Sequence, residues 1–217
     1  MTRNAAPRAR RSRLAPLPRR FYERDTEIVA RELLGAVIEC HTDEGVAAGR
    51  IVETEAYIGE HDLACHAAAG RTRRTAPLYG PPGTSYVYFI YGVHWCFNAV
   101  TRDEGMPSAV LIRALEPLLG IEIARTRRPA AKRDVDLMNG PGKLCEALGI
   151  DARHNATRLD RPPVRILSGA PVAAAAVTVT PRIGISESKD WPLRFLVTDS
   201  PFVSRTPKSF PRLRSER

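Results

Sequence analysis

The most constraining feature of the sequence is a cluster of three strand-like segments between residues 84 and 115. β-branched and aromatic residues dominate 84–91, 95–100 and 109–115, and the stretches between them are short. Closely spaced runs of this kind, separated by turn residues, are typical of neighbouring antiparallel strands. The sequence therefore predicts a β-sheet at the centre of the fold, and 217 residues are enough for one large domain around it.

Further elements are predicted on both sides of this cluster. An apolar pattern followed by a glycine predicts a helix over 27–34, and Asn139-Gly-Pro-Gly142 opens a helix that stops at Gly149. A third helical pattern covers 118–128. The remaining strand-like runs are 36–40, 49–57, 164–167, 177–179 and 193–197. Nothing marks a domain boundary, so we expect a single mixed α+β domain.

The positive charge of the chain is concentrated at its two ends. The net charge is +9, of which residues 1–20 contribute +7 and residues 205–217 contribute +4, so residues 21–204 sum to −2. An Arg- and Pro-rich segment without an apolar run cannot form a core. We therefore expect a flexible basic arm at 1–20, a folded domain at 21–204 and a basic tail at 205–217. The composition of this arm is equally compatible with two roles: an arm that contacts DNA, or a solvated segment with no specific role.

Other features of the composition bear on the compartment and on metals. No apolar run approaches the ~20 residues needed to span a bilayer, and the first residues lack the apolar segment of an export signal. Four widely spaced cysteines without a C-x-x-C pair are expected to be reduced thiols. Cys40-His41 and Cys65-His66 are adjacent pairs whose side chains would point to opposite faces of a strand, so structural zinc is disfavoured.

The first candidate site is the alternating set Glu53, Glu55 and Tyr57. On a strand these three side chains share one face. Burying two carboxylates on an apolar strand is costly. The window alone therefore favours an exposed edge strand with solvated acids slightly over a general base beside an aromatic platform.

The second candidate site is an aromatic hairpin. Six of the fourteen aromatic residues lie within 86–97, and Tyr91-Gly92 falls at the reversal. Aromatic residues of a hairpin normally pack into the core. A bulky ring at an exposed tip is also a suitable wedge for a base stack, and the other tyrosines can stack on a base. Both interpretations stay open at this point.

Two basic segments could hold phosphates. Gly140-Pro-Gly-Lys143 lacks the spacing of a P-loop, but a helix N-terminus with a lysine can bind a phosphate. A capped helix start explains that segment equally well. The loop 71–79 contains Arg71, Arg73 and Arg74, which either contact phosphates or only solvate the loop.

Seven segments together resemble the alkyladenine (3-methyladenine) DNA glycosylase family. They occur in the same order and cover the chain from about residue 20 to 204. Each segment alone is a weak signal, but seven in order make a chance resemblance implausible. The matching segments are 50–57, 83–92, 96–98, 111–117, 139–148, 182–185 and 192–195.

The resemblance implies a monofunctional DNA glycosylase of base-excision repair. Such an enzyme flips an alkylated or deaminated purine out of double-stranded DNA and hydrolyses its N-glycosidic bond, which leaves an abasic site. It implies a curved, largely antiparallel sheet with surrounding helices and a protruding β-hairpin. It implies no cofactor, no metal and no membrane, and it implies a monomer in the bacterial cytoplasm near the nucleoid, or in a eukaryotic nucleus.

The resemblance also implies roles for individual residues. Glu55 matches the catalytic base that activates water, and Arg113 matches an arginine of the catalytic neighbourhood. Tyr91 matches the ring that fills the gap left by the flipped nucleotide. The implied base-binding pocket consists of Tyr57, His66 and Tyr88, which sandwich the base, and Asn98, which rejects normal guanine.

Two rival functions remain compatible with the residues. A non-catalytic binder of distorted or damaged DNA would use the wedge and the aromatic hairpin, with Glu55 in a structural role. A metal-dependent hydrolase would use His61, Asp62 and His66. The lesion preference among 3-methyladenine, 7-methylguanine, hypoxanthine and etheno adducts does not follow from the sequence.

Deleting residues 1–20 is expected to flatten the salt dependence of nonspecific DNA binding. The deletion removes seven arginines, so fewer phosphate counterions are released on binding. The slope of log K against log salt, measured on undamaged duplex by fluorescence anisotropy, checks this. An unchanged slope would show that the arm does not contact DNA.

Overall fold

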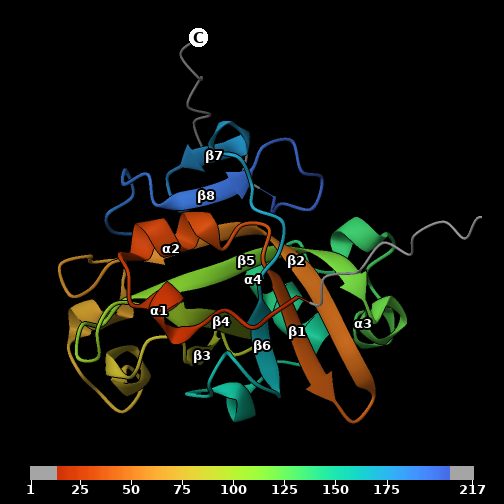
Figure 1. Ribbon diagram of the computed structural model, residues 1–217, viewed down its shortest axis with the longest axis horizontal. Coiled ribbons are helices and arrows are strands. Elements are labelled where there is room, and N and C mark those ends of the chain that lie inside the picture. Colours follow the sequence, from red (N-terminus) through yellow and green to blue (C-terminus); the bar gives the residue numbers. More distant parts are fainter. Residues whose placement is uncertain (1–13, 206–217) are drawn as a thin grey trace, which may run out of the picture.

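In the computed structural model, residues 14–205 are described, and within them the chain forms one eight-stranded sheet (Figure 1). The strands are β1 (Val37–Thr42), β2 (Gly45–Tyr57), β3 (Ser85–Ile90), β4 (His94–Val100), β5 (Ala109–Leu119), β6 (Val164–Leu167), β7 (Val177–Thr180) and β8 (Arg194–Val197). The helices are α1 (Arg19–Tyr22), α2 (Thr26–Glu32), α3 (Ile121–Arg127) and α4 (Pro141–Leu148). Short 3-10 turns cover His66–Ala69, Ala76–Tyr79, Asp134–Asp136, Ala152–His154 and Ala174–Ala176.

All strand pairs of the sheet are antiparallel. The order is β3-β4-β5-β2-β1-β6, and β8 pairs with both β2 and β7. The predicted α+β class with a largely antiparallel sheet is therefore confirmed. In Figure 1 the β7–β8 ribbon lies at the top and the long β1–β2 hairpin runs to the lower right.

Strand β2 is the central element of the sheet. Its first part, up to Arg50, pairs with β1, and residues 48–57 pair with β5 on the other edge. Past Arg50, where the pairing with β1 stops, residues 53–55 of β2 pair with β8 on that side. Glu53 and Glu55 are therefore flanked by strands on both sides, and the expectation of an exposed edge strand with solvated acids is wrong.

Helix α2 determines which face of β2 carries the acids. The Thr54 hydroxyl donates a hydrogen bond of 2.8 Å to the carbonyl oxygen of Ala30 in α2. Because neighbouring residues on a strand point to opposite faces, Glu53 and Glu55 project away from this helix. Helix α4 packs against β4 and β5, and its end is formed by Gly149, whose φ of 74° completes the C-cap.

Two boundaries differ from those predicted from the sequence. Strand β5 continues through Pro117 to Leu119, because the register shift at Gly49 accommodates a residue that cannot donate to the ladder. The following helix begins only after Gly120, whose φ of 67° turns the chain. Helix α1 was not predicted.

Residues 14–20, which the charge pattern groups with the basic arm, contact the sheet. The Leu17 amide donates to the Ile166 carbonyl at 2.9 Å, and the Ser168 amide donates to the Ala15 carbonyl at 2.7 Å. Residues 1–13 and 206–217 of the expected arm and tail lie outside the described residues. A deletion confined to 1–13 still removes five arginines and leaves these sheet contacts in place.

The four cysteines are free and buried. Within residues 14–205, every helix is too short, or carries too little apolar surface, to cross a bilayer.

Candidate active site

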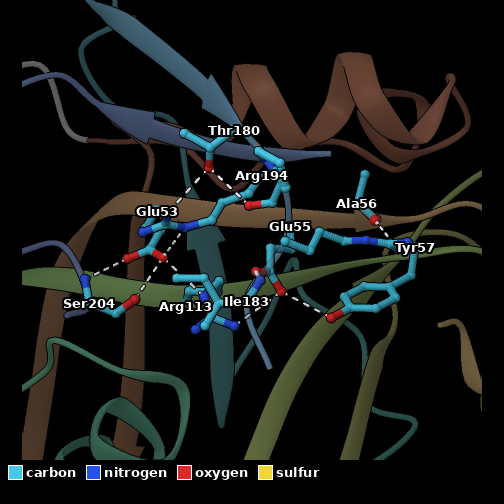
Figure 2. Close-up of polar contacts among 11 residues, drawn as sticks. Glu53, Glu55, Ala56, Tyr57, Arg113, Thr180, Ile183, Arg194 and Ser204 are labelled. Carbon is cyan, nitrogen blue, oxygen red and sulfur yellow. Dashed lines mark hydrogen bonds and ion pairs between the residues drawn. The ribbon is translucent and has the colours of Figure 1, made fainter. Parts of the chain in front are cut away.

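A buried arginine lies between the two carboxylates of β2 (Figure 2). Arg113 of β5 donates from Nε to Glu53 Oε1 at 3.0 Å and from Nη1 to Glu55 Oε2 at 3.1 Å. Both glutamates are fully buried, and Arg113 is only 7% exposed. Burial alone would lower the pKa of Arg113, but Glu55 and Glu53 raise it above its usual range. The guanidinium therefore stays charged and compensates the repulsion between two neighbouring carboxylates.

Glu53 accepts hydrogen bonds from four donors. Besides Arg113, Arg194 Nε donates to Oε1 at 2.7 Å, Ser204 Oγ donates to Oε1 at 2.8 Å, and the Ser204 amide donates to Oε2 at 2.6 Å. Burial would raise the pKa of Glu53, but the two arginines and Ser204 lower it overall. This carboxylate ties β8 and the segment at Ser204 to β2, so its role is structural.

Glu55 accepts fewer hydrogen bonds than Glu53. Its Oε2 accepts from the Tyr57 hydroxyl at 3.0 Å and from Arg113, and its Oε1 accepts from the Ile183 amide at 2.8 Å. An ionised carboxylate can accept about four hydrogen bonds. Glu55 therefore keeps capacity for one more donor, as a general base that activates water requires.

A cavity of about 230 Å³ is lined by Tyr57, whose hydroxyl is bonded to Glu55. Its walls come from the end of β2, the loop around His66, strands β3 and β4, and the segment 184–186. The cavity is smaller than a typical drug-sized site of roughly 300–1,000 Å³, so it suits one small ring system. The lining residues that carry the argument are Tyr57, His66, Tyr86, Tyr88, Asn98 and Ile185.

The aromatic wall of the cavity is held together by close ring contacts. His66 and Tyr88 have ring centroids 4.5 Å apart in an edge-to-face arrangement, and Tyr86 and Tyr88 are 5.2 Å apart. His66 Nδ1 lies 2.8 Å from the Tyr86 hydroxyl. Burial, reinforced by Arg74, lowers the pKa of His66 to about 4, so its ring is neutral at physiological pH. Asn98 is paired with Tyr86 across the strands, and its Nδ2 donates to the Tyr86 carbonyl at 2.9 Å.

The tip of the β3–β4 hairpin projects into solvent. Tyr91 and Gly92 have φ of 54° and 68°, the combination of a type I′ turn, which favours glycine or asparagine. Tyr91 nevertheless occupies the first position, and its side chain is 79% exposed. The neighbouring ring of Phe89 packs on Trp95 at 4.8 Å. Phe89 and Val93 are also exposed, at 44% and 66%, so Tyr91 is the most exposed large side chain of a tip that faces solvent.

The four candidate phosphate contacts do not form one cluster. Arg71 lies over the Tyr79 ring at 5.5 Å and Arg74 over the Tyr88 ring at 5.5 Å. Arg73 is exposed. Lys143 donates to Asn139 Oδ1 at 2.7 Å at the start of α4, outside the cavity lining.

A second buried ion pair was not predicted from the sequence. Arg182 and Asp62 are both fully buried, and two nitrogens of the guanidinium bind both carboxylate oxygens at 2.5 and 2.7 Å. Asp62 is thus engaged by Arg182 and not arranged with His61 and His66. Among residues 14–205, no three His, Cys, Asp or Glu side chains form a group that could hold a metal ion. Within these residues, His61, Asp62 and His66 are thus not assembled as the ligand set that a metal-dependent hydrolase would use.

Comparison with known proteins identifies a family of DNA glycosylases. The family model described as Methylpurine-DNA glycosylase matches residues 20–201. The chain belongs to that family.

Curated relatives are similar over nearly their whole length. A protein of Koribacter versatilis named "Putative 3-methyladenine DNA glycosylase" is 47% identical over 202 residues, which is 91% of this chain and 97% of the relative. Proteins with the same name from Myxococcus xanthus and Methanoculleus marisnigri are 48% and 45% identical, over 88% and 87% of this chain and 94% and 98% of those relatives.

Replacing Glu53 by glutamine is expected to destabilise the fold by about 3–5 kcal/mol, because two buried guanidiniums lose their shared carboxylate. The matched control is Glu116→Gln, which removes a half-exposed pair with Arg50 at 2.8 Å and should cost less than about 1 kcal/mol. Urea unfolding of both variants measures the difference.

The Glu53 carboxylate also predicts how the stability of the fold depends on pH. Because the pKa of Glu53 is lowered in the folded state, its stabilisation is present above the unfolded pKa of roughly 4.3 and is lost as the pH falls through the folded pKa. The stability gap between wild type and Glu53→Gln should therefore narrow in acid. Equal destabilisation by both variants, or a gap independent of pH, would contradict the structural role of Glu53.

Proposed function

We propose that this chain is a monofunctional DNA glycosylase that excises alkylated or deaminated purines from double-stranded DNA. The observation that carries the proposal is Glu55, a buried carboxylate with free acceptor capacity. It is hydrogen-bonded to Tyr57, a wall of the aromatic cavity. A damaged base held against that wall brings its glycosidic bond close to Glu55. No cofactor is needed for this chemistry.

The proposed reaction is hydrolysis of the N-glycosidic bond. As the purine leaves, positive charge develops on the deoxyribose ring, as in other glycoside hydrolyses. The Glu55 carboxylate stabilises this charge and takes a proton from the attacking water. The Tyr57 hydroxyl and the Ile183 amide fix its orientation, and Arg113 donates a further hydrogen bond to it. The products are a free base and an abasic site in an uncut strand.

Base recognition depends on the aromatic walls of the cavity. Flipping a purine out of the duplex costs a few kcal/mol, and least for a damaged pair. Stacking on Tyr57, His66 and Tyr88 recovers about 1–3 kcal/mol per contact. We propose that Asn98, which borders the cavity, excludes guanine through its exocyclic amine.

The remaining proposals concern the contact with DNA. Tyr91 is proposed to enter the gap left by the flipped nucleotide, and Arg71, Arg73, Arg74 and Lys143 are proposed to contact phosphates. The basic arm would add sequence-independent attraction. We propose a monomer that acts on chromosomal DNA, in the cytoplasm of a bacterial cell.

Replacing Glu55 by glutamine is expected to abolish base release while lesion binding is retained, because the amide cannot accept a proton from water. A loss of about 10²-fold or more is expected for a missing general base. Single-turnover release of hypoxanthine and binding to the same duplex are measured side by side. Release at the wild-type rate would exclude Glu55 as the base, and failure of wild type to release any base would favour the non-catalytic binder.

Replacing Tyr91 by serine is expected to weaken binding to lesion-bearing duplex, because the gap in the base stack is no longer filled. Loss of one stacking ring corresponds to about 1–3 kcal/mol of binding free energy. Leu119→Ser is the matched control, since Leu119 is 54% exposed at the far end of β5. If Tyr91→Ser and Leu119→Ser bind damaged DNA equally well, Tyr91 is not the wedge.

A further inference from the structure

Two of the three tyrosines that line the cavity, Tyr57 and Tyr88, have an arginine over their rings. The Arg182 guanidinium lies 4.6 Å from the centroid of the Tyr57 ring, and the Arg74 guanidinium lies 5.5 Å from that of Tyr88. A cation over an aromatic face is attracted by the ring quadrupole. Each wall therefore already has a cation associated with it before any base enters.

The two arginines differ in how their charge is compensated. Arg182 is fully buried, binds both oxygens of Asp62 and also donates to the Ala56 carbonyl at 3.0 Å. Arg74 is exposed. Within the described part of the chain, no carboxylate forms an ion pair with it. The charge beside Tyr57 is thus neutralised, and the charge beside Tyr88 is not.

The uncompensated charge of Arg74 reaches the other groups of the same wall. After burial, Arg74 is the second cause that lowers the pKa of His66, and it also opposes the rise in the pKa of Tyr86. His66 and Tyr86 line the cavity together with Tyr88. A second positive charge in the cavity would therefore be repelled by Arg74, as a proton on His66 already is.

This repulsion distinguishes two chemical classes of damaged purine. Purines alkylated at N3 or N7, such as 3-methyladenine and 7-methylguanine, carry a positive charge while attached to the sugar. Hypoxanthine and etheno adducts are uncharged. A cationic base stacked on Tyr88 would be repelled by the Arg74 guanidinium, which lies 5.5 Å from the centroid of the same ring, whereas an uncharged base stacks without that cost.

We infer that Arg74 is a specificity-determining residue that disfavours cationic purines in the cavity and so biases excision toward uncharged lesions. The inference rests on the proposed glycosylase function and adds a substrate class to it. It differs from a phosphate contact, which would favour all lesions equally because phosphates carry no base information.

The test compares Arg74→Gln with Arg73→Gln. Both variants remove one positive charge from adjacent exposed positions of the same loop, but only Arg74 lies over a ring of the cavity. Single-turnover base release is measured on two duplexes that differ only in one lesion, 7-methylguanine or hypoxanthine. Binding affinity for the same two duplexes is also measured with each variant combined with Glu55→Gln, because this measurement does not depend on catalysis.

The rate ratio of 7-methylguanine to hypoxanthine is expected to rise about 3- to 10-fold in Arg74→Gln, as for loss of one unit charge near a partly solvated site. The ratio should stay at its wild-type value in Arg73→Gln. In the Glu55→Gln background, Arg74→Gln should likewise raise the affinity for the 7-methylguanine duplex relative to the hypoxanthine duplex.

Two results would overturn the inference while leaving the proposed function intact. One is an equal loss of base release from both lesions in Arg74→Gln and in Arg73→Gln, which is the result expected if both arginines only contact phosphates. The other is an unchanged ratio in Arg74→Gln with normal release of both bases. If the wild-type protein released neither base, the proposed function would be overturned instead. In that case the binding affinities decide the inference: an unchanged ratio of the affinities for the 7-methylguanine and hypoxanthine duplexes in Arg74→Gln would overturn the charge discrimination as well.

Discussion

The position of Arg113 between Glu53 and Glu55 is the interaction on which the rest of the site depends. Two carboxylates on one face of a buried strand repel each other and lose their hydration, and only a buried cation can compensate both effects. Arg113 bonds to both at 3.0 and 3.1 Å. The arrangement requires β5 to lie beside β2 with the register shifts found near Glu53. The strand pairing and the site chemistry are therefore one constraint.

The difference between the two glutamates follows from what else each one contacts. Glu53 accepts from Arg194 and twice from Ser204, in addition to Arg113. Glu55 accepts instead from a tyrosine hydroxyl and a backbone amide, both beside the cavity. One carboxylate is thereby saturated and structural, while the other keeps acceptor capacity next to the cavity. The same residue type on the same strand thus has two different environments, and only that of Glu55 suits the proposed general base.

Local pattern was sufficient to predict most of the strands and the common face of Glu53, Glu55 and Tyr57. It was not sufficient to decide whether that face is exposed, because β8 joins β2 from more than 130 residues away in the chain. Arg194 and Ser204 were missed for the same reason. The resemblance covered Arg182 in a matching segment, but no local signal connects it to Asp62, which the sequence suggested only as a metal ligand. Long-range pairing of buried charges requires the three-dimensional structure.

The cavity also shows why the net charge of the chain says little about the reaction. The +9 surplus lies at the two ends, whereas the cavity is lined by a neutral His66 and Arg182, over the Tyr57 ring, is paired with Asp62. The charges near the cavity are individual ones: the carboxylate of Glu55, bonded to the Tyr57 hydroxyl, and the guanidinium of Arg74 over the Tyr88 ring. In our proposal, attraction to DNA and discrimination between bases therefore belong to different parts of the chain.

We propose that the site hydrolyses an N-glycosidic bond without cutting the strand. The most direct measurement uses a duplex with a single hypoxanthine and the wild-type protein, with the released base and the strand length analysed from the same reaction. We expect free hypoxanthine and an intact strand that breaks only after alkali treatment. Absence of free base, or strand cleavage without alkali, would contradict it.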